Sequence, residues 1–164
     1  QLDVFSRLMM ERICSVIGEA YPDAQFEPMI NIAHNYAVWE NHFDENVIVH
    51  RKGATRAREG EVGIIPGSQG TRSYIVEGLG NPDSFQSCSH GAGRAMSRTE
   101  AVRNLSLETE VSRLEEQGIV HAIRGQKDLE EAAGAYKDID EVMANQTDLV
   151  KIVTALSPVA VIKG

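Results

Sequence analysis

Two short apolar segments, Val62-Gly63-Ile64-Ile65 and Ser73-Tyr74-Ile75-Val76, enclose the loop Pro66-Gly67-Ser68-Gln69-Gly70-Thr71-Arg72. β-Branched and aromatic residues between glycine-containing turns are typical of strands joined by hairpins. Glycine recurs in this way from residue 53 to residue 93. The sequence therefore predicts a glycine-rich β region, and a segment with so many turns suits a binding surface.

The segments on either side of this region alternate between helical and extended patterns. Apolar residues at three- and four-residue spacing predict helices over residues 4–17, 30–40, 97–116 and 138–151, and β-branched runs predict strands over residues 46–50 and 157–162. In the second helix we expect the more buried positions to be Ile32, Ala33, Tyr36, Ala37 and Val38. The fold class that follows is α+β, with the β region packed against flanking helices.

Charge is distributed unevenly along the 164 residues. The net charge is −8, but residues 51–103 carry 8 basic and 5 acidic side chains, a balance of +3, against −6 before them and −5 after them. Because Lys and Arg supply most of the affinity for a phosphate backbone, this middle segment could hold an anionic substrate. Ordinary variation of surface charge is the alternative.

Length, hydropathy and cysteine content set further limits. A chain of this length is expected to form one compact domain. No apolar run reaches the roughly 18 residues needed to cross a bilayer, so we expect no membrane contact and a cytoplasmic location. Cys14 and Cys88 match neither a C-x-x-C pair nor a disulfide scaffold, and we expect both to be reduced and structural.

The strongest candidate for a catalytic residue is His90, within Ser87-Cys88-Ser89-His90-Gly91-Ala92-Gly93-Arg94. Glycines beside a histidine let backbone N–H groups approach a phosphate, and a helix beginning just after them would direct its positive dipole end at the anion. A histidine whose second ring nitrogen is held by a partner can attack phosphorus, and Arg94 could neutralise charge on the phosphoryl oxygens. On spacing alone, a turn histidine without chemistry is the alternative.

Three other segments could contact the same ligand. The loop over residues 65–73 could cradle phosphate or read a base edge, or it could be a plain hairpin loop. His34 could bind a metal ion or make a structural hydrogen bond. Arg51, Lys52 and Arg56 follow a predicted strand, and they could grip phosphate or form a solvated charged turn.

Taken together and in this order, four motifs resemble those of the RtcB-type tRNA-splicing and RNA-repair ligases. They are A-H-N at residues 33–35, H-R-K-G-A-T-R at 50–56, I-P-G-S-x-G-T-x-S-Y at 65–74 and S-C-S-H-G-A-G-R-x-M-S-R at 87–98. The resemblance continues through Gly134-Ala135-Tyr136-Lys137-Asp138-Ile139 to the terminal Val161-Ile162-Lys163-Gly164. It covers nearly the whole chain.

The resemblance implies a ligase that joins RNA ending in a 2′,3′-cyclic phosphate or 3′-phosphate to RNA beginning with a 5′-hydroxyl, using GTP and Mn²⁺. A histidine is guanylated, the guanylate passes to the RNA 3′-phosphate, and the 5′-hydroxyl displaces it. The partners implied are these RNA ends, while the need for an archease-type activator stays open.

Carried over to this sequence, the resemblance implies that His90 is guanylated and that His34 is a Mn²⁺ ligand. It implies guanylate contacts on and beside the two glycine loops, from Asn35, Pro66, Gly67, Ser68, Gln69, Ser73, Gly91, Ala92, Gly93, Tyr136 and Lys163. The basic residues Arg51, Lys52, Arg56 and Arg94 are expected to contact RNA or phosphate.

The chief departure from the family is length. We expect residues 1–164 to be the C-terminal portion of a larger catalytic domain, because the remaining metal ligands of the family lie in an N-terminal portion that this sequence lacks. If the chain begins at Gln1, we expect an incomplete Mn²⁺ site and no ligation unless another chain or a lost segment supplies the missing part. The alternatives are a metal-dependent phosphohydrolase or nucleotidyl-transfer relative, and a non-catalytic fragment or interaction module.

Overall fold

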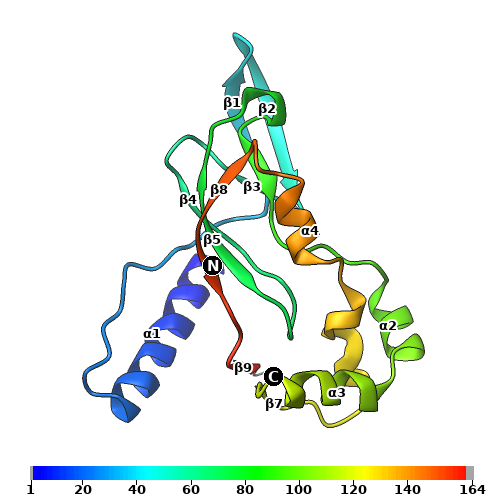
Figure 1. The fold of residues 1–164 in the computed structure, drawn as a ribbon. Coiled ribbons are helices and arrows are strands. Elements are labelled where there is room, and N and C mark those ends of the chain that lie inside the picture. The colour runs from blue at the N-terminus through cyan, green and yellow to red at the C-terminus, as the bar shows by residue number, and fades with distance from the viewer. Residues whose placement is uncertain (1, 162–164) are drawn as a thin grey trace.

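The computed structural model describes residues 2–161, in which helices and small, mostly antiparallel sheets alternate, and it confirms the α+β fold class (Figure 1). The strands are β1 (Asn35–His42), β2 (Glu45–Lys52), β3 (Ala54–Arg56), β4 (Val62–Ile65), β5 (Ser73–Gly78), β6 (Ser87–Ser89), β7 (Val120–His121), β8 (Val150–Leu156) and β9 (Ala160–Val161). The α-helices are α1 (Leu2–Ala20), α2 (Arg98–Asn104), α3 (Leu107–Glu116) and α4 (Ile139–Ala144). Short 3-10 helices are η1 (Pro82–Ser84), η2 (Gln126–Glu131) and η3 (Ala133–Ala135).

The glycine-rich region forms the predicted hairpin. Strand β4 pairs antiparallel with β5, which pairs antiparallel with β8. The helix predicted over residues 138–151 is confirmed only within α4. Its last two residues belong to β8 instead. The β-branched run in β8 supplies the third strand of this sheet, with one irregularity in register between Ile75 and Val76.

The helix predicted over residues 30–40 is wrong, because residues 30–34 form neither helix nor strand and the chain then forms β1. Strand β1 pairs with β2 from Asn35–Lys52 to His42–Glu45. The two turn residues between the strands, Phe43 and Asp44, have φ values of 54° and 62°, the geometry of a tight hairpin turn. Polar residues occupy inward positions of β1, so the apolar alternation that indicates a strand is missing from the sequence.

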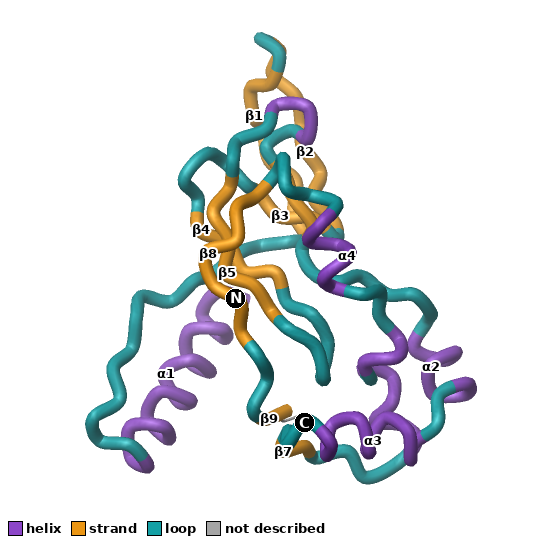
Figure 2. The backbone as a smooth tube through the Cα atoms, viewed as in Figure 1, coloured by secondary structure: helices purple, strands orange, loops and turns teal. Residues whose placement is uncertain are grey.

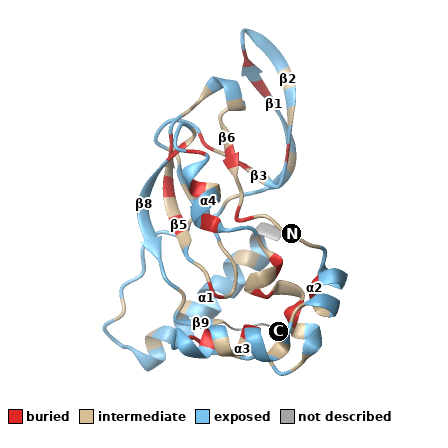
Figure 3. Cartoon of the chain, turned by 45° about the vertical axis from the view of Figure 1, so that its right-hand side comes forward, coloured by how far each residue is buried: buried red, intermediate tan, exposed pale blue. Residues whose placement is uncertain are grey.

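The core lies between the three-stranded sheet, β6 and α4. It contains Ala57, Ile65, Tyr74, Val76, Cys88, Ala92, Ile139, Met143 and Val150. Figure 3 shows buried segments along β5, β6 and α4. Strand β6 pairs antiparallel with β3 at the edge of this core, and it leads directly into His90. The core therefore anchors the segment that carries the candidate nucleophile.

The helix predicted over residues 97–116 is two helices, α2 and α3, as Figure 2 shows by the loop between them. The Ser97 hydroxyl accepts from the Glu100 N–H, and the Glu100 carboxylate accepts from the Ser97 N–H, which is a capping box at the start of α2. The hydroxyl of Ser106 accepts from the Thr109 N–H and starts α3. A second N-cap inside a helical pattern therefore divides it.

The helix predicted over residues 4–17 is confirmed within α1, but its apolar side is not covered. Val4, Phe5, Leu8 and Ile13 are all at least 47% exposed, and none of the other described elements packs extensively against this helix. No helix in the described part of the chain combines the length and the apolar character that a membrane span requires.

The strand predicted over residues 157–162 is confirmed at β9, which pairs in parallel with β7. Its last residue, Ile162, lies outside the described residues, as does Lys163.

Candidate functional site

His90 is held by a backbone group from another part of the chain. Its ring nitrogen Nδ1 lies 2.8 Å from the carbonyl oxygen of Gly53, in the turn between β2 and β3. Because a carbonyl can only accept, Nδ1 carries the proton in this contact, and Nε2 is the ring nitrogen left to act as a nucleophile. Gly53 has a φ of +74°, a conformation that favours glycine. This contact gives His90 the orientation and tautomer that a nucleophilic nitrogen requires.

The ring of His34 lies beside that of His90. The ring centroids are 5.3 Å apart and the planes differ by 20°, so the two imidazoles are stacked. His34 directly precedes β1, which brings Asn35 to the same place. Folding thus brings together two histidines that are 56 residues apart in the sequence.

The two glycine loops are in direct contact. The Ala92 N–H donates to the Pro66 carbonyl at 3.0 Å. A Cβ added to Gly91 would lie 3.0 Å from that same carbonyl oxygen, so this position accepts a side chain only if the backbone shifts. The loop that follows His90 and the loop between β4 and β5 thus form one surface, with glycine needed at the joint.

The second loop is ordered by its own hydroxyl groups. The Ser68 N–H donates to Thr71 Oγ1 at 2.7 Å, and the Gly67 N–H donates to Ser73 Oγ at 3.4 Å. Gln69 differs, because its Oε1 is buried and has no hydrogen-bond partner among the described residues. It lines a pocket of about 330 Å³ together with Ala122, Ile123, Lys127, Asp128, Glu130 and Val161. A buried acceptor beside a pocket is suited to a ligand that carries hydrogen-bond donors.

The region after Gly93 does not form the helix that the phosphate-cradle prediction requires. Helix α2 starts at Arg98, five residues beyond Gly93, so its N-terminus does not begin at the glycines. Arg94 and Tyr136 form an isolated β-bridge instead, and the Lys137 N–H donates to the Gly93 carbonyl at 2.9 Å. Any phosphate contact here relies on loop N–H groups and side chains without a helix dipole.

Arg94 is engaged by neighbouring protein groups. Its guanidinium lies 4.9 Å from the centre of the Tyr136 ring and donates to the Tyr136 hydroxyl at 3.1 Å. It also pairs with Glu131 at 3.2 Å, and the Tyr136 hydroxyl donates to the same carboxylate. Burial and the hydrogen bond to Glu131 raise the pKa of Tyr136. We expected Arg94 to contact a phosphate group. Such a phosphate would have to compete with Tyr136 and Glu131 for the guanidinium.

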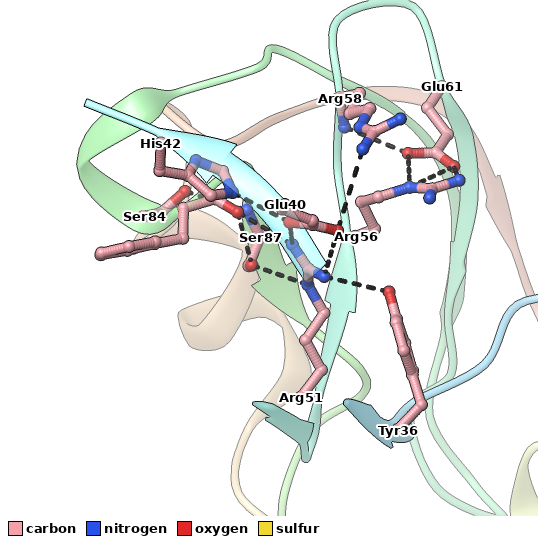
Figure 4. A network of polar contacts seen from close by, with 10 residues as sticks. Tyr36, Glu40, His42, Arg51, Arg56, Arg58, Glu61, Ser84 and Ser87 are labelled. Atoms are coloured by element: carbon pink, nitrogen blue, oxygen red, sulfur yellow. Dashed lines mark hydrogen bonds and ion pairs between the residues drawn. The ribbon is translucent and has the colours of Figure 1, made fainter. Parts of the chain in front are cut away.

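Arg51 requires a correction, because it is buried and does not lie on the surface. Figure 4 shows the polar contacts that surround it. Its Nη1 and Nη2 donate to the two carboxylate oxygens of Glu40, both at 2.8 Å. Its Nε donates to Ser87 Oγ at 3.0 Å, and Nη2 also donates to the Phe85 carbonyl at 2.9 Å. Arg51 therefore ties the β1–β2 hairpin to the segment that enters β6. It helps to set Gly53, two residues later, against His90.

The carboxylate of Glu40 is surrounded by basic groups. Besides Arg51, His42 Nε2 lies 2.9 Å and Arg58 3.9 Å from it. The hydrogen bonds from Arg51 lower the pKa of Glu40 to about 2, against the opposing effect of burial, with His42 contributing to the lowering. The network is a structural ion cluster, which sequence reasoning missed because Glu40 was placed on a helix.

The positive excess of residues 51–103 is largely neutralised by contacts. Carboxylates pair with Arg51, Arg56, Arg58, Arg72, Arg94 and Arg98. Arg56, expected to contact phosphate, has its side chain 37% exposed and bonded to Glu61. Lys52 is exposed and forms no ion pair within the described residues. Of the expected phosphate contacts in the 50–56 motif, Lys52 is the one whose charge is available.

A metal site is only partly represented. In residues 2–161 no group of three or more His, Cys, Asp and Glu side chains could hold a metal ion. His34 could offer an imidazole nitrogen, but one or two imidazoles do not complete a Mn²⁺ site, which also needs oxygen ligands. Cys88 is buried against Thr55, and burial raises the pKa of its thiol, so it is a structural residue as predicted.

Comparison with known proteins bears on the whole chain. A model of the family "tRNA-splicing ligase RtcB" matches residues 3–164. The RNA-splicing ligase RtcB of Escherichia coli (strain K12) is 50% identical over 162 residues, which cover 95% of this chain and 39% of that protein. The tRNA-splicing ligase RtcB of Nanoarchaeum equitans is 41% identical over 162 residues, covering 84% of this chain and 34% of that protein. The chain thus spans well under half the length of these curated relatives.

Proposed function

The chain belongs to the tRNA-splicing ligase RtcB family, and from this premise we propose that it provides the nucleotide-transfer site of an enzyme that joins RNA ends. The RNA ends would be a 2′,3′-cyclic phosphate or 3′-phosphate and a 5′-hydroxyl, and GTP would supply the activating nucleotide. The observation that carries the proposal is the contact between His90 Nδ1 and the Gly53 carbonyl, because it holds the ring through Nδ1 and leaves Nε2 as the nitrogen that can attack.

The reaction would begin with His90. Its Nε2 attacks the α-phosphorus of GTP, a P–N bond forms, and the bond to the bridging oxygen of the β-phosphate breaks, so that pyrophosphate leaves. An oxygen of the RNA 3′-phosphate then takes the guanylate from the histidine. The 5′-hydroxyl of the second RNA finally attacks the activated phosphorus, closes the phosphodiester and releases GMP.

The residues beside His90 suit the binding of a nucleotide. Loop N–H groups from Gly91 and Gly93 would face the phosphates. Ala92, whose N–H donates to the Pro66 carbonyl, joins them to the loop formed by Pro66, Gly67, Ser68 and Ser73. The buried Oε1 of Gln69 would accept from a guanine N–H in the adjoining pocket. Asn35 lies beside His34, Tyr136 packs under Arg94, and the contact expected from Lys163 stays a prediction because it lies outside the described residues.

The requirement for Mn²⁺ also stays a prediction. The family resemblance implies that it would orient the phosphates and offset their charge. The described residues offer His34 but no complete ligand set, so no step is assigned to the metal.

Guanylation can be measured without RNA. The chain, supplied with the portion of the catalytic domain expected to carry the remaining metal ligands, is incubated with GTP labelled at the α-phosphate and Mn²⁺, and a phosphoramidate should appear that is labile to acid and stable to base. His90→Gln should abolish it, whereas His121→Gln, a histidine of β7 bonded to the Ile123 N–H, should not. Release of phosphate without labelled protein would favour a phosphohydrolase. Guanine nucleotide that leaves the melting temperature unchanged would favour a non-catalytic module and refute the proposal.

A further inference from the structure

One face of the β1–β2 hairpin has only exposed side chains along its length. Side chains alternate between faces of a strand, so the antiparallel register places four pairs on the same side. We name this the outer hairpin face, and its residues are Asn35, Ala37, Trp39, Asn41, Asn46, Ile48, His50 and Lys52. All of them are exposed, whereas the opposite face holds the buried Glu40, His42 and Arg51. The hairpin projects from the rest of the chain, as Figure 1 and Figure 3 both show.

The charge of the outer hairpin face differs from that of the chain. The chain carries 24 acidic and 16 basic side chains, yet the outer hairpin face has no carboxylate, and it has one lysine and one histidine. The acidic residues of the hairpin lie elsewhere: Glu40 and Glu45 point to the opposite face, and Asp44 lies in the turn. An anionic partner therefore meets no like charge along this face.

Trp39 stands in the middle of the outer hairpin face. It is 68% exposed and lies opposite Ile48, which is 48% exposed. Beside the indole is an open hollow of about 580 Å³ lined by Trp39, Asn41 and Asn46, and by Glu40, whose two carboxylate oxygens are bonded to Arg51 on the other side of the hairpin. Nδ2 of Asn41 donates to Oδ1 of Asn46 at 3.1 Å, which leaves further amide donors and acceptors toward the hollow. A flat aromatic surface next to amide groups suits an unstacked nucleobase.

The outer hairpin face begins at the candidate site. Lys52 directly precedes Gly53, whose carbonyl holds His90, and Asn35 directly follows His34, which stacks on His90. Trp39 is four residues along β1 from Asn35, about 14 Å at the rise of an antiparallel strand. A strand of RNA with its end at His90 could therefore place its phosphate at Lys52 and a nearby base on Trp39.

We propose that the outer hairpin face binds single-stranded RNA next to the end being joined, with Trp39 as the stacking platform and Lys52 as the phosphate contact. The inference rests on the proposed function for the identity of its ligand. RNA fits better than a protein partner because the face is polar apart from Trp39, Ile48 and Ala37, and has no acidic group. Base stacking on an exposed aromatic tolerates any sequence, as a ligase of varied ends requires.

Trp39 is the only tryptophan of the sequence, so its fluorescence reports on this face alone. The full chain is titrated with a short single-stranded oligouridylate, while fluorescence and the anisotropy of labelled RNA are recorded together. RNA should quench Trp39 along the binding curve. Trp39→Ala should weaken binding about tenfold and Trp39→Phe should largely restore it. Tyr21→Ala, which removes an aromatic ring that is 70% exposed at the end of α1, is the matched control and should leave affinity unchanged.

The lysine is tested through salt dependence. Lys52→Gln should lower the slope of log affinity against log salt by about 0.7, the value for one phosphate contact on a single strand. Lys151→Gln, an exposed lysine on β8, serves as its control. Melting temperatures of all variants establish that they are folded.

The outcomes separate the two proposals. RNA that binds without quenching Trp39, or with equal affinity for Trp39→Ala, overturns the role of the outer hairpin face. A Trp39 that acrylamide cannot quench would mean that protein covers this face, and it would overturn the inference too. If His90 is guanylated by GTP in such a case, the proposed function stands alone. If RNA quenches Trp39 but no guanylation occurs, the RNA surface stands and the proposed function fails.

Discussion

Replacing Glu40 by glutamine would remove the negative charge at the centre of the buried ion cluster while keeping the shape of the side chain. The side chains of Glu40 and Arg51 are only 3% and 1% exposed. In Glu40→Gln the Arg51 guanidinium would stay buried without a counter-charge, and an amide offers one acceptor where the carboxylate offers two.

The size of the loss follows from two independent arguments. Breaking a buried ion pair by removal of one partner costs about 3–5 kcal/mol, because the other charge is left uncompensated. The pKa of Glu40 is about 2 against an ordinary value of 4.5, which corresponds to about 3 kcal/mol at 1.36 kcal/mol per pKa unit. Because the carboxylate is almost inaccessible, solvent screening reduces this value little. We therefore expect Glu40→Gln to lower the free energy of unfolding by about 3 kcal/mol.

Urea denaturation of the full chain, followed by circular dichroism, measures this change. Glu45→Gln on the same hairpin is the control, and it should change the free energy of unfolding by less than about 0.5 kcal/mol because Glu45 is exposed. The double variant Glu40→Gln/Arg51→Met should recover part of the loss, since no buried charge is left unpaired. A loss below about 1 kcal/mol for Glu40→Gln, or strict additivity in the double variant, would refute the reasoning.

The same group predicts a pH dependence. A carboxylate whose pKa is lowered on folding contributes stability that is complete above its unfolded pKa and is lost as the pH falls through its folded pKa. For Glu40 this window runs from about 4.5 down to about 2. The difference in unfolding free energy between the parent chain and Glu40→Gln should therefore shrink as the pH is lowered through this range. A difference that stays constant between pH 7 and pH 2 would contradict the assignment.

Two further substitutions test the joint of the loops and the start of α2. Gly91→Ala should slow guanylation of His90, because its Cβ would lie 3.0 Å from the Pro66 carbonyl oxygen and push the two loops apart. Gly125→Ala is the control, because its new Cβ would meet nothing within 4 Å. Equal guanylation rates for the two variants would disprove the close approach at Gly91. Ser97→Ala should lower the free energy of unfolding by about 1 kcal/mol, because it removes one half of the capping box, and an unchanged denaturation midpoint would argue against that cap.

Some features follow from local sequence because their causes are local. The hairpin of β4 and β5 needs only β-branched residues on both sides of a glycine-containing loop. Helix α1 can be predicted from the three- and four-residue spacing of its apolar residues. The start of α3 was available in principle, because Ser106 is an N-cap residue followed by a helical pattern. The expectation of one unbroken helix there overlooked that signal.

Other features depend on partners that lie far away in the sequence. The strand character of residues 35–42 is stabilised by pairing with β2 and by the burial of Glu40 against Arg51, and a strand with charged residues inside has no apolar alternation to detect. Residues 150–156 likewise become a strand because the free edge of β5 is available to them. Single-sequence patterns contain neither effect.

For the site, the sequence by itself determined which residue types are present: a histidine between two glycine-containing motifs, a second histidine in a segment predicted to be helical, and loops able to approach phosphate. Only the tertiary structure decided how they can act. It placed the Gly53 carbonyl on His90 Nδ1, stacked His34 on the same ring and buried Gln69 Oε1 with no hydrogen-bond partner among residues 2–161. It also withdrew Arg51 from the surface. The physical reason is that tautomer, burial and charge pairing depend on groups brought together by folding, and no motif spacing records them.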